Sequence, residues 1–347
     1  MKKRLAIIGF GGQGAWHAGW AKKSDCIELA GIYDIKKERC DFAISEGIKV
    51  YKSQDELLSD ESVDIVLCAT PNDSHKDISI AALRAGKHVV CEKPVTLSVA
   101  DFDEIVKTAK ELKRHFSVHQ NRRWDVDYLA IKGIIDSGEI GEVINIESRS
   151  HGSRGCPGDW RLHKPSGGMM LDWGVHLIDQ IMLLIPEKLV NVYCEMTNIT
   201  TTEVDDGFNL RLTFESGKRA TVEVGTYNFI NLPRMYMQCK EGTAYIEEWR
   251  SNTRVAKLKK WVEKDVTPVQ TAAGITRTMA PRDDVSVDFY EIPRLTADVH
   301  NFYRNFVSVI DSSDEPIVKC EEVRRVLLVM EAAFKSWELR QALKVEI

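Results

Sequence analysis

A lysine near the middle of the first half of the sequence has the type and position expected of a catalytic group. Lys93 lies in Glu92-Lys93-Pro94, directly after Val89-Val90-Cys91, an apolar run that we predict to be a buried strand. A lysine just past the carboxyl end of a central strand faces the crevice in which open α/β sheets bind ligands. The tripeptide by itself more often marks a surface lysine in a tight turn, so its interpretation depends on the rest of the chain.

Asp172 and His176 form a second candidate pair. They lie four residues apart in residues 169–184, a largely apolar stretch that we predict to be one buried helix. This spacing places both side chains on one helix face. An Asp can hold a His in one tautomer and stabilise its protonated form, which suits a general base. A structural Asp–His pair, a metal pair and a plain core histidine are the alternatives; we favour catalysis and expect no metal.

A glycine-rich turn follows the first predicted strand, residues 4–9. Gly9-Phe10-Gly11-Gly12-Gln13-Gly14 has the G-x-G-x-x-G pattern in its required place between a strand and a helix. Gly9 permits the tight turn, Gly11 lets a pyrophosphate approach the backbone, and Gly14 allows close packing. The helix N-terminus would hold the anion. We therefore predict that Gly9, Gly11, Gly12, Gln13 and Gly14 bind a dinucleotide.

Asp34 ends the second predicted strand, residues 27–33. It follows Gly14 by 20 residues, near the spacing of the acid that binds an adenosine ribose. An acid here favours NAD because it repels the 2′-phosphate of NADP. Lys36 and Lys37 leave NADP open, and a helix N-cap is the alternative role of Asp34.

Further strands at residues 63–69, 87–91 and 116–119 alternate with helices, which predicts a doubly wound parallel sheet. The carboxyl ends of such strands share one edge. Asn72 and His75 have the alternative roles of a turn residue and a helix-terminal histidine. The cofactor contacts that we predict at this edge are Thr70, Pro71, Asn72, His75, Glu92, Lys93 and Gln120.

The second half of the chain has a different pattern. Successive alternating strands between residues 189 and 248 predict a large, open, mainly antiparallel sheet with one covered face. We predict an α/β protein with a Rossmann domain at residues 1–121 and an α+β substrate domain at residues 122–347. Residues 249–290 have no clear pattern, and helices are expected at residues 295–310 and 321–343, the last near the domain boundary. His300 is interpreted as a surface or capping residue.

The composition excludes several classes of protein. The 347 residues are 44% hydrophobic and 29% charged, with a net charge of -5, so no basic footprint for nucleic acid appears. No apolar run is long enough for a membrane helix. Eight cysteines without a C-x-x-C pair predict reduced thiols in a cytoplasmic protein.

Four motifs in order resemble the Gfo/Idh/MocA family of oxidoreductases: the glycine loop, Thr70-Pro71-Asn72, Glu92-Lys93-Pro94, and Gly167-Gly168-x-x-x-Asp172-x-Gly174-x-His176. The resemblance covers essentially the whole chain. It implies an NAD(P)-dependent dehydrogenase acting on a hydroxyl of a sugar or cyclitol, in which Lys93 contacts the reacting hydroxyl while Asp172 and His176 orient the substrate and move its proton. It also implies a homodimer or homotetramer formed through the open sheet. The substrate candidates, chosen from their loop or strand-end positions, are Arg123, His151, Trp160 and Arg161.

Three other functions remain open at this point. An enzyme with tightly bound NAD could cleave glycosides through a 3-keto intermediate, and the absence of released NADH would identify it. A non-catalytic NAD(P) sensor would not need the Lys93, Asp172 and His176 set. A reductase of a flat ligand, similar to biliverdin reductase, would not need the Asp–His pair.

Overall fold

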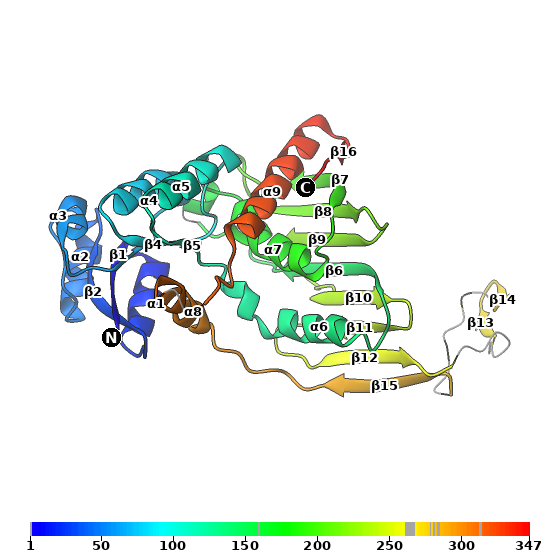
Figure 1. The fold of residues 1–347 in the computed structure, drawn as a ribbon. Helices are drawn as coiled ribbons and strands as arrows, with labels where there is room; N and C mark the ends of the chain where they lie inside the picture. Colours follow the sequence, from blue (N-terminus) through cyan, green and yellow to red (C-terminus); the bar gives the residue numbers. More distant parts are fainter. Residues whose placement is uncertain are drawn as a thin grey trace.

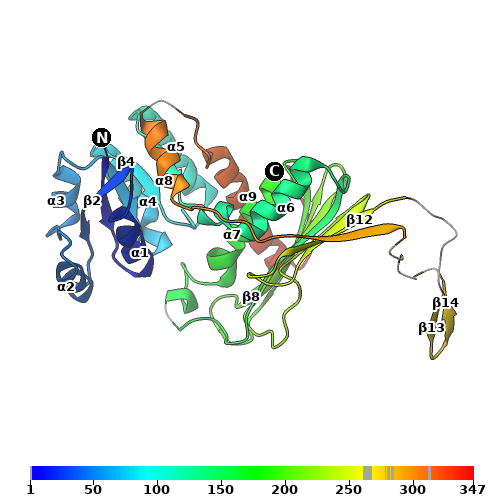
Figure 2. The same ribbon diagram turned by 90° about the horizontal axis from the view of Figure 1, so that it is seen from below.

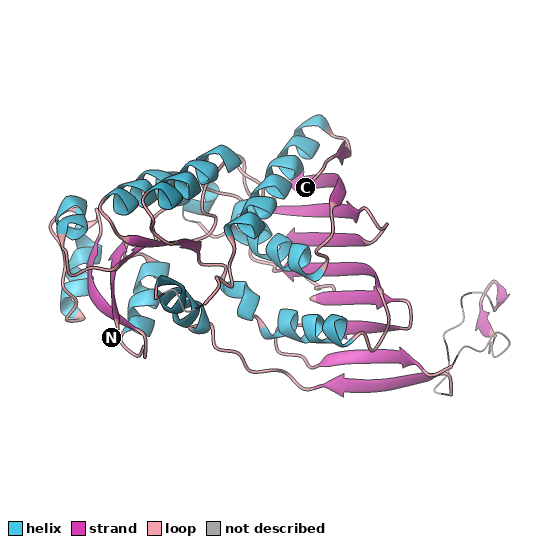
Figure 3. Ribbon diagram, in the orientation of Figure 1, coloured by secondary structure: helices cyan, strands magenta, loops and turns pink. Residues whose placement is uncertain are grey.

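The computed structural model describes residues 2–158, 160–260, 268–277, 279, 282, 285–311 and 314–347. Two sheets lie side by side along the chain, each with its own helices (Figure 1). The first sheet is small and parallel, and the second is larger and open on one face (Figure 3).

The first sheet has five parallel strands in the order β2-β1-β3-β4-β5, so the predicted doubly wound parallel sheet is confirmed. Its strands are β1 (Lys3–Ile8), β2 (Ile27–Tyr33), β3 (Ile65–Cys68), β4 (His88–Cys91) and β5 (Phe116–Val118). β3 is fully buried, as expected of a strand covered on both faces. The helices around this sheet are α1 (Gly12–Ala21), α2 (Lys37–Ser45), α3 (Gln54–Ser59), α4 (His75–Arg84) and α5 (Val99–Glu111).

The second sheet has nine strands in the order β15-β12-β11-β10-β6-β9-β8-β7-β16. Only β6 and β9 pair in parallel within it, so the prediction of a mainly antiparallel sheet is confirmed for the described residues. Its strands are β6 (Val143–His151), β7 (Leu189–Thr197), β8 (Gly207–Phe214), β9 (Arg219–Gly225), β10 (Met235–Cys239), β11 (Gly242–Ile246), β12 (Thr253–Leu258), β15 (Val287–Ile292) and β16 (Leu343–Lys344). A separate hairpin of β13 (Val269–Thr271) and β14 (Gly274–Thr276) lies apart from this sheet, beyond the ends of β12 and β15 (Figure 1).

Three helices cover one face of the nine-stranded sheet: α6 (Val126–Ser137), α7 (Val175–Leu184) and α9 (Cys320–Leu339), as Figure 2 shows. The inward side chains alternate along the strands, for example Leu210, Leu212 and Phe214 of β8. α9 also contacts α5, where Glu331 accepts a hydrogen bond from Val99 N at 2.8 Å. This helix therefore ties the two sheets together.

A late segment of the chain returns to the parallel sheet. α8 (Asn301–Ile310) lies beside α1, and Tyr303 Oη lies 2.8 Å from His17 Nδ1 (Figure 1). His300 is only 4% exposed, and its Nε2 lies 2.6 Å from Ser24 Oγ. His300 is the N-cap residue of α8, as the capping interpretation expects, but the surface interpretation is wrong. Its side-chain partner Ser24 lies 276 residues away in sequence, so no local pattern shows the burial. Within the described residues, no helix combines the length and apolarity needed to span a bilayer.

Candidate active site

Lys93 and Asp172 meet where the two sheets adjoin. Lys93 Nζ donates to the Asp172 carboxylate Oδ1 and to its carbonyl oxygen, both at 3.0 Å. Arg161 Nε donates to the other carboxylate oxygen of Asp172 at 2.8 Å. Burial acts to raise the pKa of Asp172, which is 8% exposed, but the charges of Lys93 and Arg161 outweigh it and lower that pKa. An ionised Asp172 thus holds one predicted catalytic lysine and one predicted substrate arginine.

Asp172 does not hold His176, contrary to the prediction. The stretch expected to be one α-helix begins with a π-helical turn, Met170–Gly174, and only then continues as α7. The wider turn changes which side chains stack, so the four-residue spacing no longer brings the two together. One carboxylate oxygen of Asp172 accepts from Lys93 and the other accepts from Arg161, and no hydrogen bond joins Asp172 to His176 among the described residues.

His176 is buried, and no polar partner of its ring lies among the described residues. It is 4% exposed, and its Nδ1 has no hydrogen-bond partner among the described residues. Burial, followed by the charges of Lys93 and Arg122, lowers the pKa of His176 well below its ordinary value of 6.5. The ring is therefore neutral at neutral pH and able to accept a proton.

An aromatic wall borders His176. The ring of Trp173 lies 6.3 Å from His176 and 5.7 Å from Trp249. The guanidinium of Arg122 lies 4.2 Å from the Trp173 ring centre.

The sequence did not predict Trp173, Trp249 or Arg122 as site residues, and only the position of Trp173 directly after Asp172 in the motif offered a signal. On the loop after β6, Arg161 lies 4.6 Å over the ring of Trp160, which is partly exposed.

Glu92 lies in a buried network rather than in open space at the sheet edge. One carboxylate oxygen of Glu92 bonds both His17 Nε2, at 2.8 Å, and His119 Nδ1, at 2.9 Å. Tyr303 Oη bonds the remaining ring nitrogen of His17. Burial acts to raise the pKa of Glu92, yet the two histidines lower it well below its ordinary value. Burial, followed by the charge of His119, lowers the pKa of His17 to about 4.

Arg123 links two helices of the second domain, so the prediction that it binds substrate is not supported. Its Nε and one terminal nitrogen donate to the Asp179 carboxylate at 2.8 and 2.7 Å. The other terminal nitrogen donates to Glu322 at 2.6 Å and to the carbonyl of Ile317 at 3.0 Å. All three nitrogens are thus committed to protein groups, and the side chain is buried between α7 and α9.

His151 also has partners away from Lys93. It ends β6, where its Nδ1 accepts from Leu232 N at 3.3 Å and its Nε2 lies 3.6 Å from Glu223. None of the hydrogen bonds or ion pairs of the described residues joins it to Lys93, Asp172 or His176. His151 was predicted to bind substrate because it ends a strand, but the sequence does not show which end of that strand lies near the site.

The glycine loop has the shape that a dinucleotide requires. A Cβ on Gly14 would lie 2.0 Å from the Gly9 carbonyl oxygen, and Gly9 itself has φ +93°. A Cβ on Gly11 or Gly12 would meet nothing within 4 Å, so the space above the loop is open. Gln13 is exposed on the first turn of α1. The loop is closely packed below and open above, which fits a bound pyrophosphate.

Asp34 supports this loop from the end of β2. Its two carboxylate oxygens accept from Phe10 N at 2.6 Å and from Lys36 N at 2.8 Å. The alternative N-cap role is not what the helix uses, because Lys36 occupies the N-cap position of α2 and no side chain caps it. Asp34 is therefore fixed beside the glycine loop, at the place where the ribose acid is expected.

Unpartnered polar groups collect along the same edge. Asn72 Oδ1 and both amide atoms of Gln120 are buried without a hydrogen-bond partner among the described residues. Asn72 Nδ2 reaches across to the carbonyl of Ser166 at 3.3 Å, and Ser166 Oγ is also buried and unpartnered. Buried polar atoms without partners are costly, so these groups fit a polar ligand such as a nicotinamide dinucleotide.

Comparison with known proteins gives the class and then the family. Residues 3–120 match the description "Oxidoreductase family, NAD-binding Rossmann fold" and residues 128–245 match "GFO/IDH/MocA C-terminal domain". The protein is thus an oxidoreductase with an NAD(P)-binding domain. The chain belongs to the Gfo/Idh/MocA family, so the resemblance predicted from the motifs is confirmed.

Its relatives include several named oxidoreductases. An uncharacterized oxidoreductase of Schizosaccharomyces pombe is 34% identical over 57% of this chain, which spans about half (55%) of that relative's length. A myo-inositol 2-dehydrogenase of Thermotoga maritima is 26% identical over 99% of this chain and 98% of its own. A scyllo-inositol 2-dehydrogenase (NADP(+)) of Bacillus subtilis is 27% identical over 99% and 96%. The crystal structure of an NAD-binding protein from Listeria innocua is 44% identical over 99% of both chains, with a TM-score of 0.95.

Proposed function

We propose that this oxidoreductase oxidises a secondary hydroxyl of a sugar, sugar derivative or cyclitol. The observation that carries the proposal is the Lys93 ammonium, fixed by Asp172 at the sheet edge near a neutral His176 whose Nδ1 has no partner in the described part of the chain. Two relatives that match this chain along almost its whole length are named as inositol dehydrogenases, which supports the substrate class.

The chemistry divides between the cofactor and the protein. Bound NAD(P) supplies the hydride acceptor. The protein must hold the hydroxyl and take its proton. The Lys93 ammonium favours negative charge developing on the hydroxyl oxygen. Neutral His176 accepts the proton, and its lowered pKa makes it a weak base that depends on this help from Lys93. Asp172 acts through Lys93, which it holds in place.

We assign the cofactor contacts from the open glycine loop and from the buried polar atoms without partners at the edge of the parallel sheet. Gly9, Gly11, Gly12, Gln13 and Gly14 would hold the pyrophosphate on the N-terminus of α1. Asp34 would bind the adenosine ribose and favour NAD over NADP. The nicotinamide half would lie against Thr70, Pro71, Asn72, Lys93 and Gln120. Glu92 acts through Lys93 in this proposal, because its carboxylate is bonded to histidines.

The substrate would lie between the lysine and the aromatic wall. Arg161 already touches Asp172, and Trp160, Trp173 and Trp249 offer flat apolar surfaces. A polyol presents hydroxyls for the charged groups and C–H faces for the rings. We do not include Arg123 or His151 in the substrate site, because their partners lie elsewhere.

Self-association through the uncovered face of the nine-stranded sheet is part of the same proposal. This face has a hollow of about 520 Å³ that includes Tyr245, Arg254 and Phe289, and Phe289 is 64% exposed. A second copy would cover it, as isologous dimers do. Arg254→Glu with Phe289→Asp should shift the molar mass in light scattering to that of one chain. An unchanged molar mass would reject this interface.

A substrate panel tests the proposed reaction. Inositols, aldoses and glycosides are incubated with the protein and either NAD or NADP, and absorbance of the reduced cofactor is followed. Steady reduction with an inositol or aldose supports the proposal. Product formation from a glycoside without released reduced cofactor would favour the tightly bound-NAD alternative. No turnover of any hydroxyl compound, despite measured cofactor binding, would overturn the proposed substrate class.

A further inference from the structure

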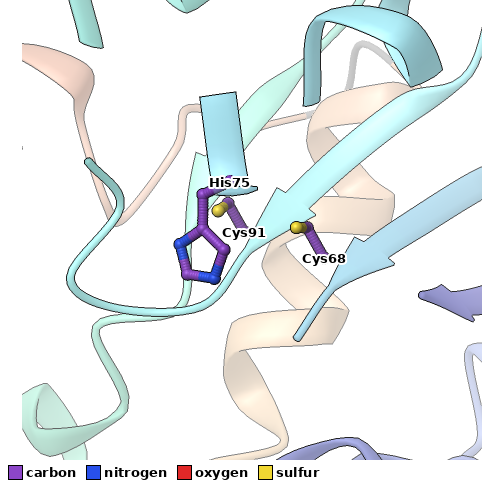
Figure 4. Close-up of side chains that lie close together, drawn as sticks. All are labelled: Cys68, His75 and Cys91. Atoms are coloured by element: carbon purple, nitrogen blue, oxygen red, sulfur yellow. The ribbon is translucent and has the colours of Figure 1, made fainter. Parts of the chain in front are cut away.

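Two cysteines and a histidine lie together at the cofactor edge of the parallel sheet (Figure 4). Cys68 ends β3 and Cys91 ends β4, and the two are register partners on adjacent strands. His75, the first residue of α4, lies over them, and the ligand atoms of the three side chains lie within 4.8 Å of one another. All three are at most 1% exposed, and the mechanism above uses neither thiol.

Both ring nitrogens of His75 face carbonyl oxygens. Nε2 lies 2.8 Å from the Thr70 carbonyl, and Nδ1 lies 3.0 Å from the Pro94 carbonyl. A carbonyl oxygen only accepts hydrogen bonds, and a neutral imidazole has a single N–H. One contact of a neutral ring would place a lone pair against a lone pair. Both contacts are satisfied when the ring carries two N–H groups, as an imidazolium.

A buried imidazolium needs a counter-charge, and Cys68 is placed to supply it. The sulfur atoms of Cys68 and Cys91 and the His75 ring lie within 4.8 Å of one another, and Thr70 Oγ1 lies 3.5 Å from the Cys68 sulfur. Burial acts to raise the pKa of Cys68, but the neighbouring Cys91 and the charge of His75 outweigh it and lower that pKa. Burial and the neighbouring Cys68 raise the pKa of Cys91. Of the two thiols, Cys68 is therefore the one that loses its proton more readily.

A metal site fits the same three residues less well. Zinc would need deprotonated thiols and a free lone pair on the imidazole. Both nitrogens of His75 already point at carbonyl oxygens, so neither lone pair is directed at an ion between the sulfurs. The arrangement favours a charge pair over a metal centre.

We propose that Cys68 and His75 form a buried thiolate–imidazolium pair that positions the cofactor edge. The imidazolium joins two loops: Thr70 follows β3, and Pro94 is the residue after Lys93. The first loop also packs against the glycine turn, since a Cβ on Gly9 would lie 2.7 Å from the Ala69 backbone. His75 is thus a positioning residue that acts through both loops. This inference rests on NAD(P) binding and not on the proposed substrate.

Two spectroscopic measurements on the protein without cofactor test the pair directly. The ultraviolet absorbance of thiolate should show one thiolate per chain at neutral pH, and ring nitrogen chemical shifts, assigned with His75→Gln, should show both nitrogens of His75 protonated. Cys68→Ser should remove the thiolate absorbance. Cys91→Ser, which keeps a hydroxyl donor, and Cys194→Ser, a buried thiol in β7, should retain it. A neutral His75 or the absence of a thiolate at neutral pH would overturn the proposal even if the variants failed to fold.

Cofactor affinity tests the positioning role. Cys68→Ser and His75→Gln should each weaken NAD⁺ binding in calorimetry by roughly tenfold, the size of one charge-assisted hydrogen bond. The binding should also weaken on acidification that protonates Cys68; besides His75, the titratable groups acting on the thiols are Cys91 and Glu92. Affinity equal to that of Cys194→Ser would reject the role in positioning.

Zinc content separates the charge pair from a metal site. Protein purified with and without a chelator should contain no stoichiometric zinc and show the same thiolate absorbance. Stoichiometric zinc that depends on Cys68 and Cys91 would overturn the charge pair in favour of a metal centre.

Discussion

Glu92 and Lys93 are neighbours in sequence and belong to two different polar clusters. Glu92 is enclosed with His17, His119 and Tyr303 in a chain of hydrogen bonds between protein groups. The Lys93 side chain instead bonds Asp172, near His176, whose Nδ1 has no partner among the residues that the structure describes. The first cluster is held together by Glu92 and joins α1, α8 and the ends of β4 and β5, with His119 Nε2 as its one ring nitrogen that lacks a partner among the described residues. The second has polar capacity left for a ligand.

This difference separates two uses of buried polar groups. A buried carboxylate held by hydrogen bonds to protein groups fixes a structure, and Glu92 also accepts a hydrogen bond from Lys93 N at 3.2 Å. A buried group without a partner is costly unless a ligand satisfies it, so it points to function. We therefore expect variants of the Lys93 cluster to lose activity and variants of the Glu92 cluster to lose stability.

The largest expected effect is that of Lys93→Met. Loss of the ammonium should lower kcat by roughly 10³-fold, the scale of one preorganised electrostatic group at developing charge. The free energy of unfolding, measured with denaturant, should change much less. Lys132→Met is the matched control, because its ammonium pairs with Asp136 on an exposed helix face. Near-normal kcat in the Lys93 variant would remove this residue from the chemistry.

His176→Ala should have the next largest effect. Turnover should fall by roughly 10²-fold, as for a positioned base, while NAD⁺ affinity stays close to that of the parent protein. The lowered pKa of His176 also predicts that the acidic limb of the kcat profile lies below pH 6.5, since only the neutral ring accepts a proton. Exposed His163 provides the control substitution. An acidic limb above that pH, or one that persists in the variant, would contradict the base assignment.

Glu92→Gln should act mainly on stability. The variant loses charge-assisted hydrogen bonds to two buried histidines, which should lower the free energy of unfolding by about 2 kcal/mol. Glu142→Gln, an exposed partner of Lys240, should change it little. If Glu92→Gln lowered kcat as strongly as Lys93→Met and left the stability intact, the division between the two clusters would fail.

Acidification should weaken the Glu92 cluster before it reaches ordinary carboxylates. His17 has a pKa of about 4 in the fold against 6.5 in the unfolded chain, so the unfolded chain binds the proton first as the pH falls. The free energy of unfolding should therefore decrease between pH 6.5 and about 4. His17→Gln should flatten this dependence in denaturant titrations, and an equally steep curve in the variant would assign it to other groups.

Asp34→Ala should give the smallest of these effects. The substitution removes the acid beside the glycine loop, so NAD⁺ should bind roughly tenfold more weakly and NADP⁺ should be rejected less. Asp41, an exposed acid on α2 paired with Lys37, provides the control. An unchanged ratio of the two dissociation constants would show that Asp34 only supports the loop.

The sequence predicted those parts of the fold in which burial is strong and local. Residues 65–68 are apolar throughout because β3 is buried on both faces, and the glycine loop has its required neighbours. α2 was missed because only Ala43 of it is buried, which leaves almost no apolar period. β12 and β15 were missed for a similar reason, since β15 is the edge strand of the sheet, β12 lies next to it, and neither shows a clear alternation of exposed and buried residues.

The candidate site was predictable in its residue types and not in its pairings. Lys93, Asp172 and His176 stood out by motif and spacing, but a π-helical turn decided that Asp172 bonds Lys93 and Arg161. Arg123 looked available because its partner Glu322 lies 199 residues further along the chain. Which polar groups are satisfied depends on contacts between distant segments, and no local pattern shows them.

The most direct test of the central distinction measures two variants side by side, Lys93→Met and Glu92→Gln. Their kcat with the best substrate of the panel and their free energy of unfolding in denaturant are determined under the same conditions. We predict that Lys93→Met loses turnover and keeps stability, whereas Glu92→Gln loses stability and keeps most of its turnover when folded. Equal losses of both quantities in both variants would contradict the account, because the two clusters would then serve one purpose.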